Sequence, residues 1–301
     1  MAWVKIVAGS AVVLNGAQMK SRTSQILILI LSLFLASSLS GQTSSVSGQV
    51  VFSRRVYNEQ GPSYQQIWAW FPSSGVLKAL TRSPRNHLLP ACTGGKITFV
   101  SSEGEENRVN SKLWSFDPAS GEERVIGPPP MPPDHEPKPK NGCDVFAKAG
   151  SLEACGKAEN LSVSRDNKAI GHFKTDECSI DEHGTLGKCE APIVSLVWSP
   201  DAKWLSVGGT DDLHEWEYYI VNPATMKLTR FATALPDSVL WLPGRDELLY
   251  ATPEYTAPLP GARRARQVWV QQLIQFDPAT GKSTAITSGV TNNLDASLCN
   301  P

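Results

Sequence analysis

The sequence predicts an all-β fold built from repeated four-stranded antiparallel sheets, and three observations support this prediction. A hairpin pattern occurs four times, a strand–turn–strand pattern precedes most of its copies, and the two ends of the array complement each other. An internal repeat of this kind indicates tandem units of supersecondary structure. The chain has 301 residues and a formal net charge of −1, which is compatible with one sizeable β domain after a leader.

The first observation is a hairpin whose turn chemistry repeats. An apolar strand rich in aromatic residues ends at a turn in which Asp or Asn, Pro and Gly recur; the copies span 68–75, 114–121, 219–226 and 273–281. Asp and Asn side chains accept backbone hydrogen bonds, Pro fixes φ, and Gly provides positive φ. Met226 stands at the Gly position of the third copy, which predicts a different or looser turn there.

The second observation is a strand–turn–strand segment that precedes the hairpins. Residues 90–99, 197–206 and 240–250 share an apolar strand, a tight polar turn and another apolar strand. A weaker copy at 161–171 precedes a degenerate hairpin at 179–184. The full unit therefore has four strands, A to D, and its length of about 40 to 50 residues is typical of a β-propeller blade.

These motifs resemble the exported TolB-like propellers with WD40-like (PD40-type) repeats. The resemblance is closest at Trp198-Ser-Pro-Asp-Ala-Lys203 and Asp277-Pro-Ala-Thr-Gly281, whereas the turns at Cys92 and Ser164 are degenerate. It implies a propeller fold but no particular activity, because such blades serve both as binding platforms and as domains of peptidases.

The third observation concerns the two ends of the repeat array. Residues 48–52 match a B strand without an A strand before it, and 293–301 match an A strand with nothing after it. The last strand is therefore expected to complete the first blade, which removes exposed sheet edges. The A strands then give five blades, with the internal ones at Leu88, Leu161, Ser195 and Val239. A Pro-rich insertion at 127–159 could hide a sixth blade, and truncation at the start of a further blade is the alternative.

Residues 1–40 are predicted to be a leader and 41–301 the propeller. Lys20 and Arg22 precede the apolar run 26–35, and small residues follow, as in a secretory signal peptide; Met19 is the more natural start. The alternative is a retained membrane anchor, but an apolar core of about ten residues is short for a bilayer span. We therefore expect a secreted or periplasmic protein with no stable membrane insertion after cleavage.

All six cysteines follow the leader, and an even number in an exported chain favours disulfides. Spacing and position in the repeats favour three pairs, although fifteen connectivities are possible. The favoured pairs are Cys143 with Cys155, Cys178 with Cys189, and Cys92 with Cys299.

The sequence contains none of the common catalytic or nucleotide-binding signatures, including a Gly-x-Ser-x-Gly elbow and a His-Glu-x-x-His metal site. The acidic clusters with His at 134–136, 176–183 and 211–215 fall in expected loops and are interpreted as solvated turn residues. We expect no metal and no cofactor. The net charge near zero argues against a nucleic-acid partner.

Binding is expected where residues that enter the A strands converge on the rim and central channel. Three arginines in the loop at 253–266 are further candidates, because guanidinium groups suit a carboxylate or phosphate. The candidate binding residues are Asn86, His87, Asn160, Asp237, Asp295, Arg263, Arg264 and Arg266.

The sequence thus predicts a monomeric, non-catalytic scaffold that binds an unknown protein or glycan. One alternative is a five-bladed glycoside hydrolase that uses Asp237 and Asp295 with Glu159 opposite, since inverting enzymes need two carboxyl groups about 6.5 to 9.5 Å apart. A second alternative is a propeller module of a larger secreted assembly.

Overall fold

The structure is a computed structural model that describes residues 48–102, 111–130, 142–175, 191–210, 216–236, 238–262 and 264–299. The predicted signal peptide, the core of the Pro-rich segment, the degenerate hairpin at 179–184 and the Cys178–Cys189 pair lie outside these residues. No helix long and apolar enough to cross a membrane occurs among the described residues.

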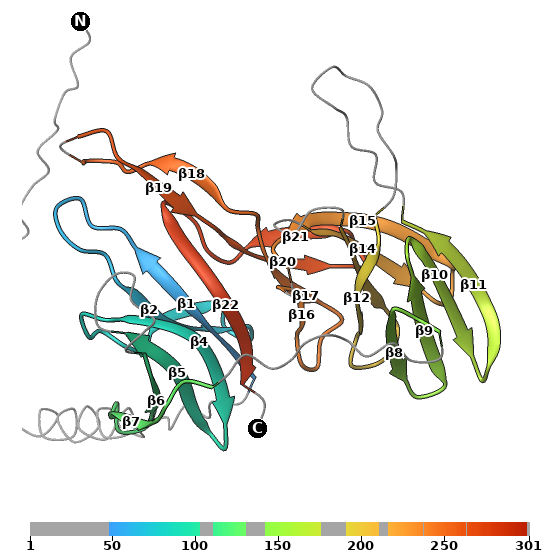
Figure 1. The fold of residues 1–301 in the computed structure, drawn as a ribbon, viewed down its shortest axis with the longest axis horizontal. Coiled ribbons are helices and arrows are strands. Elements are labelled where there is room, and N and C mark those ends of the chain that lie inside the picture. The colour runs from blue at the N-terminus through green and yellow to red at the C-terminus, as the bar shows by residue number, and fades with distance from the viewer. Residues whose placement is uncertain are drawn as a thin grey trace, which may run out of the picture. The chain divides into compact units, whose positions relative to one another are not determined.

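The described residues form five four-stranded antiparallel sheets, which we call blades 1 to 5, and one additional hairpin (Figure 1). Each blade is given below in the order A to D.

Blade 1 consists of β22 (Thr291–Cys299), β1 (Gln49–Val56), β2 (Gln65–Phe71) and β3 (Val76–Ala79). Blade 2 consists of β4 (Asn86–Thr93), β5 (Lys96–Ser102), β6 (Lys112–Phe116) and β7 (Glu123–Gly127). Blade 3 consists of β8 (Val145–Ala149), β9 (Leu152–Lys157), β10 (Asn160–Arg165) and β11 (Lys168–Lys174). Blade 4 consists of β12 (Ile193–Trp198), β13 (Leu205–Gly209), β14 (Trp216–Asn222) and β15 (Lys227–Ala234). Blade 5 consists of β16 (Leu240–Trp241), β17 (Leu248–Ala251), β20 (Leu273–Asp277) and β21 (Lys282–Ala285), and the hairpin of β18 (Tyr255–Pro258) and β19 (Gln267–Val270) is inserted between β17 and β20.

The last strand completes the first blade, as the sequence predicts. Figure 1 shows β22, at the red end of the chain, beside β1 at the blue end, and the two pair antiparallel with Val50 opposite Leu298 and Arg54 opposite Asn293. Cys92 of β4 and Cys299 of β22 are joined by a disulfide with their Cα atoms 5.0 Å apart. The predicted Cys143–Cys155 bridge is also present, with a Cα separation of 5.4 Å.

The four predicted hairpins are the C–D turns of blades 1, 2, 4 and 5. Asp117, Asn222 and Asp277 each accept a hydrogen bond at Oδ1 from the backbone amide two residues on, at 2.9 Å in every case. In the third copy, Met226 adopts a φ of 54° and its amide donates to the Asn222 carbonyl at 2.8 Å.

The prediction of a different or looser turn at Met226 is therefore wrong. In the fourth copy, the Gly281 amide donates to the Asp277 carbonyl at the same distance of 2.8 Å, with a φ of 71°. The turn imposes its left-handed conformation on methionine. The Met226 methyl group fills the space that a Cβ atom would take at Gly171 of β11, so this departure from the repeat is packed against the neighbouring blade.

Blade 3 differs from the sequence prediction in its strand assignment. The segment at 161–171, expected to contain strands A and B, forms strands C and D, and residues 145–157 supply A and B. The predicted insertion at 127–159 therefore extends too far. Leu152, Ala154 and Gly156 occupy the buried face of β9, and small residues of this kind give a weak strand pattern.

Apolar clusters join blade 3 to blade 4, blade 4 to blade 5, blade 5 to blade 1 and blade 1 to blade 2 through alternate residues of their strands. Val163 and Val207 pack between blades 3 and 4, Tyr218 and Trp241 between blades 4 and 5, and Phe52 of β1 against Leu249 of blade 5. A fourth cluster, which includes Ile67 and Phe99, lies between blades 1 and 2. Each side of the sheet in blade 1 thus faces a different core, as the two-residue period of a strand requires.

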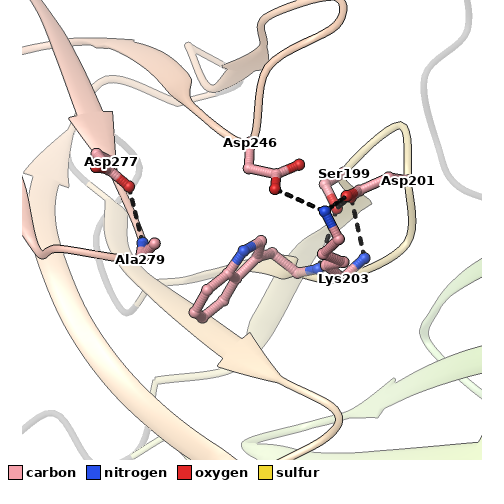
Figure 2. Close-up of polar contacts among 7 residues, drawn as sticks. Ser199, Asp201, Lys203, Asp246, Asp277 and Ala279 are labelled. Atoms are coloured by element: carbon pink, nitrogen blue, oxygen red, sulfur yellow. Dashed lines mark hydrogen bonds and ion pairs between the residues drawn. The ribbon is translucent and has the colours of Figure 1, made fainter.

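The Ser-Pro-Asp-Ala-Lys turn ties blade 4 to blade 5 (Figure 2). Lys203 Nζ lies 2.6 Å from Asp201 Oδ2 and 2.9 Å from Asp246 Oδ2 in the corresponding turn of blade 5. Burial raises the pKa of Asp201, but hydrogen bonds from Lys203 and Ser199 outweigh burial and hold this pKa well below its usual 3.8. Hydrogen bonds to Asp201 and Asp246 raise the pKa of Lys203 above its usual 10.5.

Removal of the Cys92–Cys299 bridge by a double Ala substitution is expected to lower the free energy of unfolding more than the same change at Cys143 and Cys155. The bridges span 207 and 12 residues, and loop-closure entropy assigns about 2.5 kcal/mol more to the longer one. Urea unfolding of the two oxidised variants measures the difference. An equal or larger loss in the Cys143–Cys155 variant would contradict the expectation.

The variant Asp201→Asn is expected to destabilise the protein at neutral pH, and by progressively less as the pH falls below 3.8. Because the folded pKa of Asp201 is depressed, its stabilisation is present above the unfolded value of 3.8 and is lost as pH falls toward the folded value. Urea unfolding at pH 7 and pH 2 tests this, with Asp166→Asn in the turn of blade 3 as the matched control. If the free energies of unfolding of wild type and Asp201→Asn differed by the same amount at both pH values, stabilisation by the ionised Asp201 carboxylate would be excluded.

Candidate functional site

Polar side chains gather at the end of the blades where the A strands begin, which we call the A end. Arg54 and Arg55 close β1 there, and the register places Arg54 opposite Asn293 and Arg55 opposite Asn292. Successive residues of a strand face opposite sides of its sheet. Arg54 therefore lies on the face of Phe52, toward blade 5, and Arg55 lies on the face of Val51, toward blade 2.

Arg55 and Asn86 connect blades 1 and 2. Arg55 Nη2 donates to Gln65 Oε1 at 3.4 Å and to Asn86 Oδ1 at 3.5 Å, while the backbone N–H of Gln65 donates to Asn86 Oδ1 at 2.8 Å. Asn86, a predicted binding residue, is 2% exposed. Its side chain therefore fixes the start of β4 against the neighbouring blade.

Arg54 has an aromatic partner in place of a carboxylate. Its Cζ atom lies 4.7 Å from the centre of the Trp68 ring, a cation–π distance, and burial lowers the pKa of the guanidinium. Nearby, Asn293 Nδ2 donates to the Gln271 carbonyl, and Asn292 Nδ2 donates to Glu254 Oε1 at 2.9 Å. The A end of blade 1 is thus held by neutral and charge-assisted bonds to blade 5.

Eight buried side-chain atoms without a hydrogen-bond partner lie on β1, β4, β5, β22 and the adjoining Gln271. They belong to Ser53, Arg54, Arg55, His87, Ser101, Gln271, Asn292 and Asn293. Three more occur elsewhere in the described chain, on Ser111, Trp198 and Glu217, and the last of these still forms an ion pair with Arg230. Buried polar atoms are usually paired, so this concentration of donors and acceptors marks the A end as the candidate site.

His87 is fully buried and packs edge-on against Phe99, with ring centres 4.6 Å apart. Its Nε2 atom lies 2.7 Å from Ser83 Oγ. Burial, with a smaller contribution from the positive charge of Arg85, lowers the pKa of His87 to about 4. His87 is therefore neutral at physiological pH, and it lies within the packing of blade 2.

The predicted carboxylates occupy separate positions. Asp295, with a φ of 53°, accepts a hydrogen bond at Oδ2 from the amide of Leu89 at 3.1 Å and so joins the A strands of blades 1 and 2. Glu159 lies in the B–C turn of blade 3, 4.0 Å from Lys174 Nζ, and Asn160 is exposed beside it. Asp237 and Arg263 lie outside the described residues.

The connection between β1 and β2 contacts the hairpin β18–β19. Tyr57 Oη donates to the Trp269 carbonyl at 2.7 Å, and the Tyr57 ring packs with Val268 and Val270. Burial raises the pKa of Tyr57, while the charges of Arg55, Glu254 and Arg266 also act on the phenol. Tyr57 therefore lies at the junction between the cluster of blade 1 and the predicted arginine loop.

Beside Tyr57, an open pocket of about 310 Å³ is lined by Glu59, Gln60, Ala262, Arg264 and Arg266, and we call it the arginine pocket. Hydrogen bonds within each loop hold its two walls. Asn58 Nδ2 donates to the Pro62 carbonyl at 2.7 Å, and the Leu259 amide donates to the Arg266 carbonyl at 2.8 Å. The Glu59 carboxylate lies where a side chain at Gly261 would have to be.

Arg264 and Arg266, which the sequence analysis names as candidates, line this pocket, whereas Arg54, Arg55 and Tyr57 were not among the predicted residues. The available signal was the adjacent pair Arg54-Arg55 at the end of the apolar strand Val50-Val51-Phe52. Successive side chains of a strand point to opposite faces of the sheet. When both faces are covered by neighbouring blades, two successive arginines therefore indicate polar contacts between blades.

These sheets define the chain as a β-propeller protein, an assignment that rests on their number, strand order and A-to-D pattern. No family model matches the sequence, and no curated protein matches it. A solved structure with similarity is TolB from Acinetobacter baumannii, at 13% identity over 89% of this chain and 70% of that chain, with a TM-score of 0.45.

Two further solved structures show weaker similarity. The β-propeller domain of the Trilobed protease from Pyrococcus furiosus has 15% identity over 68% of this chain and 58% of that domain, with a TM-score of 0.28. The periplasmic gluconolactonase PpgL from Pseudomonas aeruginosa has 13% identity over 83% of this chain and all of that chain, with a TM-score of 0.35.

Stability is expected to fall between pH 6.5 and pH 4 because of His87. Unfolded His87 binds a proton in this range and folded His87 does not, so the free energy of unfolding decreases by up to about 3 kcal/mol as the pH is lowered. Urea unfolding of wild type and His87→Gln at pH 7 and pH 4.5 measures this loss, with His172→Gln on β11 as control. An unchanged pH dependence in His87→Gln would contradict the assignment.

Proposed function

We propose that this protein is an exported, non-catalytic β-propeller scaffold that binds a glycan at its A end. The observation that carries the proposal is the arginine pocket, which opens beside the polar cluster of blade 1 and has preformed walls. Small-molecule sites are usually concave, largely preformed and supplied with a few convergent polar groups.

Two of the three carboxylates considered for glycoside hydrolysis, Asp295 and Glu159, support binding over catalysis. Asp295 holds the backbone of the neighbouring A strand, and Glu159 belongs to a turn of blade 3. Neither side chain lines the arginine pocket. The polar groups that line the pocket are two guanidinium groups, one amide and the Glu59 carboxylate, and they suit the binding and orientation of a ligand.

The two disulfides support export, because such bonds persist in oxidising compartments and are rare in the cytosol. The predicted leader agrees with this location. A glycan is favoured as the ligand because amide and carboxyl groups such as those of Gln60 and Glu59 suit hydroxyl donors.

Ligand binding is expected to be lost when the pocket is filled without a change of charge. The variant Ala262→Trp is designed to block the pocket, and Ala119→Trp, in the exposed C–D turn of blade 2, is the matched control. Binding of the purified full-length protein to an array of neutral and acidic oligosaccharides is measured for all three proteins. We expect wild type and Ala119→Trp to retain the same ligands and Ala262→Trp to lose them.

Absence of any oligosaccharide ligand for the wild type would overturn the proposed function, as would undiminished binding by Ala262→Trp. A separate assay with chromogenic glycosides tests the catalytic alternative. Turnover by the wild type that is abolished in Asp295→Asn would favour a glycoside hydrolase.

A further inference from the structure

The arginine pocket contains two positive charges that are not neutralised within the described chain. Arg264 and Arg266 are exposed, and neither takes part in an ion pair or a side-chain hydrogen bond among the described residues. Among the residues that the structure describes, Glu59 supplies the only carboxylate of the pocket wall, and it makes no ion pair there with either arginine. Guanidinium groups in this state are ready donors to a carboxylate or phosphate.

The surroundings of the pocket strengthen the preference for an anion. Arg55, Arg266 and Glu254 all act on the Tyr57 phenol at the junction with blade 1. The wall of the pocket itself carries two arginines, at 264 and 266, against one glutamate, at 59. An excess of positive charge around a concave site attracts anions and repels ammonium groups.

The remaining wall of the pocket requires hydrogen-bond donors from the ligand. Glu59 provides carboxylate oxygens and Gln60 an amide oxygen, and both can accept from hydroxyl groups. A ligand ammonium group would also suit Glu59, but the neighbouring arginines disfavour it. A hydroxylated acid satisfies both sides of the pocket, whereas a simple anion would leave Glu59 facing a like charge.

We propose that the arginine pocket binds an acidic saccharide, with the sugar carboxylate or phosphate on Arg264 and Arg266 and adjacent hydroxyl groups on Glu59 and Gln60. This inference rests on the proposed function and specifies its ligand. The pocket volume of about 310 Å³ is at the lower end of the range for small-molecule sites, so the pocket holds a terminal sugar unit or a short segment of a chain.

The test compares matched acidic and neutral probes by isothermal titration calorimetry with the full-length protein. Trigalacturonate and glucose 6-phosphate carry the anion, and galactotriose and glucose are their neutral counterparts. We expect at least one acidic probe to bind at least tenfold more tightly than its neutral counterpart. We also expect Arg264→Gln and Arg266→Gln each to weaken that binding about tenfold or more.

The control Arg124→Gln removes the same charge from an exposed position on β7 and is expected to leave binding unchanged. Higher salt is expected to weaken binding of the acidic probe, because the arginines are exposed. Thermal unfolding of each variant establishes that it is folded. Inorganic sulfate serves as the simple-anion probe. The ratio of the affinity for the acidic sugar to the affinity for sulfate is expected to be smaller in Glu59→Gln than in wild type, because this variant lacks the negative charge that disfavours a simple anion.

The outcomes separate this inference from the proposed function. Equal binding of neutral and acidic sugars that is unaffected at Arg264 and Arg266 would overturn the inference and leave the glycan scaffold standing. If Arg124→Gln weakened binding of the acidic probe as much as the pocket variants do, the effect would come from net charge alone, and the inference would also be overturned. Arginine-dependent binding of a poly-glutamate peptide in preference to every sugar would show that the ligand is a peptide. Absence of binding to all saccharide probes would overturn the inference, and the wider array then decides the proposed function.

Discussion

Backbone hydrogen bonds between β22 and β1 join the end of the described chain to its beginning and bring together most of the residues discussed above. They place Asn292 and Asn293 opposite Arg55 and Arg54, and Cys299 within reach of Cys92. Through the same strand, Asp295 meets the backbone of Leu89, from which it is separated by 206 residues. Without this pairing, blade 1 would lack its A strand, and the A end would lack Asn292 and Asn293.

Much of the fold could be predicted because it is determined by local chemistry. The C–D hairpins follow from Asp or Asn and Pro in a turn, and the shared blade follows from an unmatched strand at each end. Prediction failed in blade 3, where β8 and β9 contain Ala and Gly at positions that other blades fill with branched or aromatic residues. There the buried face is defined by packing against blade 4, which sequence periodicity does not reveal.

The candidate site was predictable only in part. Arg264 and Arg266 were evident because a charged loop interrupts the repeat, and they line the pocket. Asn86, His87 and Asp295 lie in A strands, as predicted. Their side chains, however, contact neighbouring segments of the protein. The contribution of Arg54, Arg55 and Tyr57 depends on contacts between blades that are distant in sequence, such as Tyr57 with Trp269.

The contact between Met226 and Gly171 has a consequence for how this protein can vary. A turn that favours Gly carries a methionine, and the neighbouring strand carries a glycine where the methionine methyl group lies. Either residue alone is unfavourable, the first for its backbone conformation and the second for its lack of a packing side chain. Together they form a complementary pair, so related chains are expected to exchange both positions at once, with Gly at 226 accompanied by a larger residue at 171.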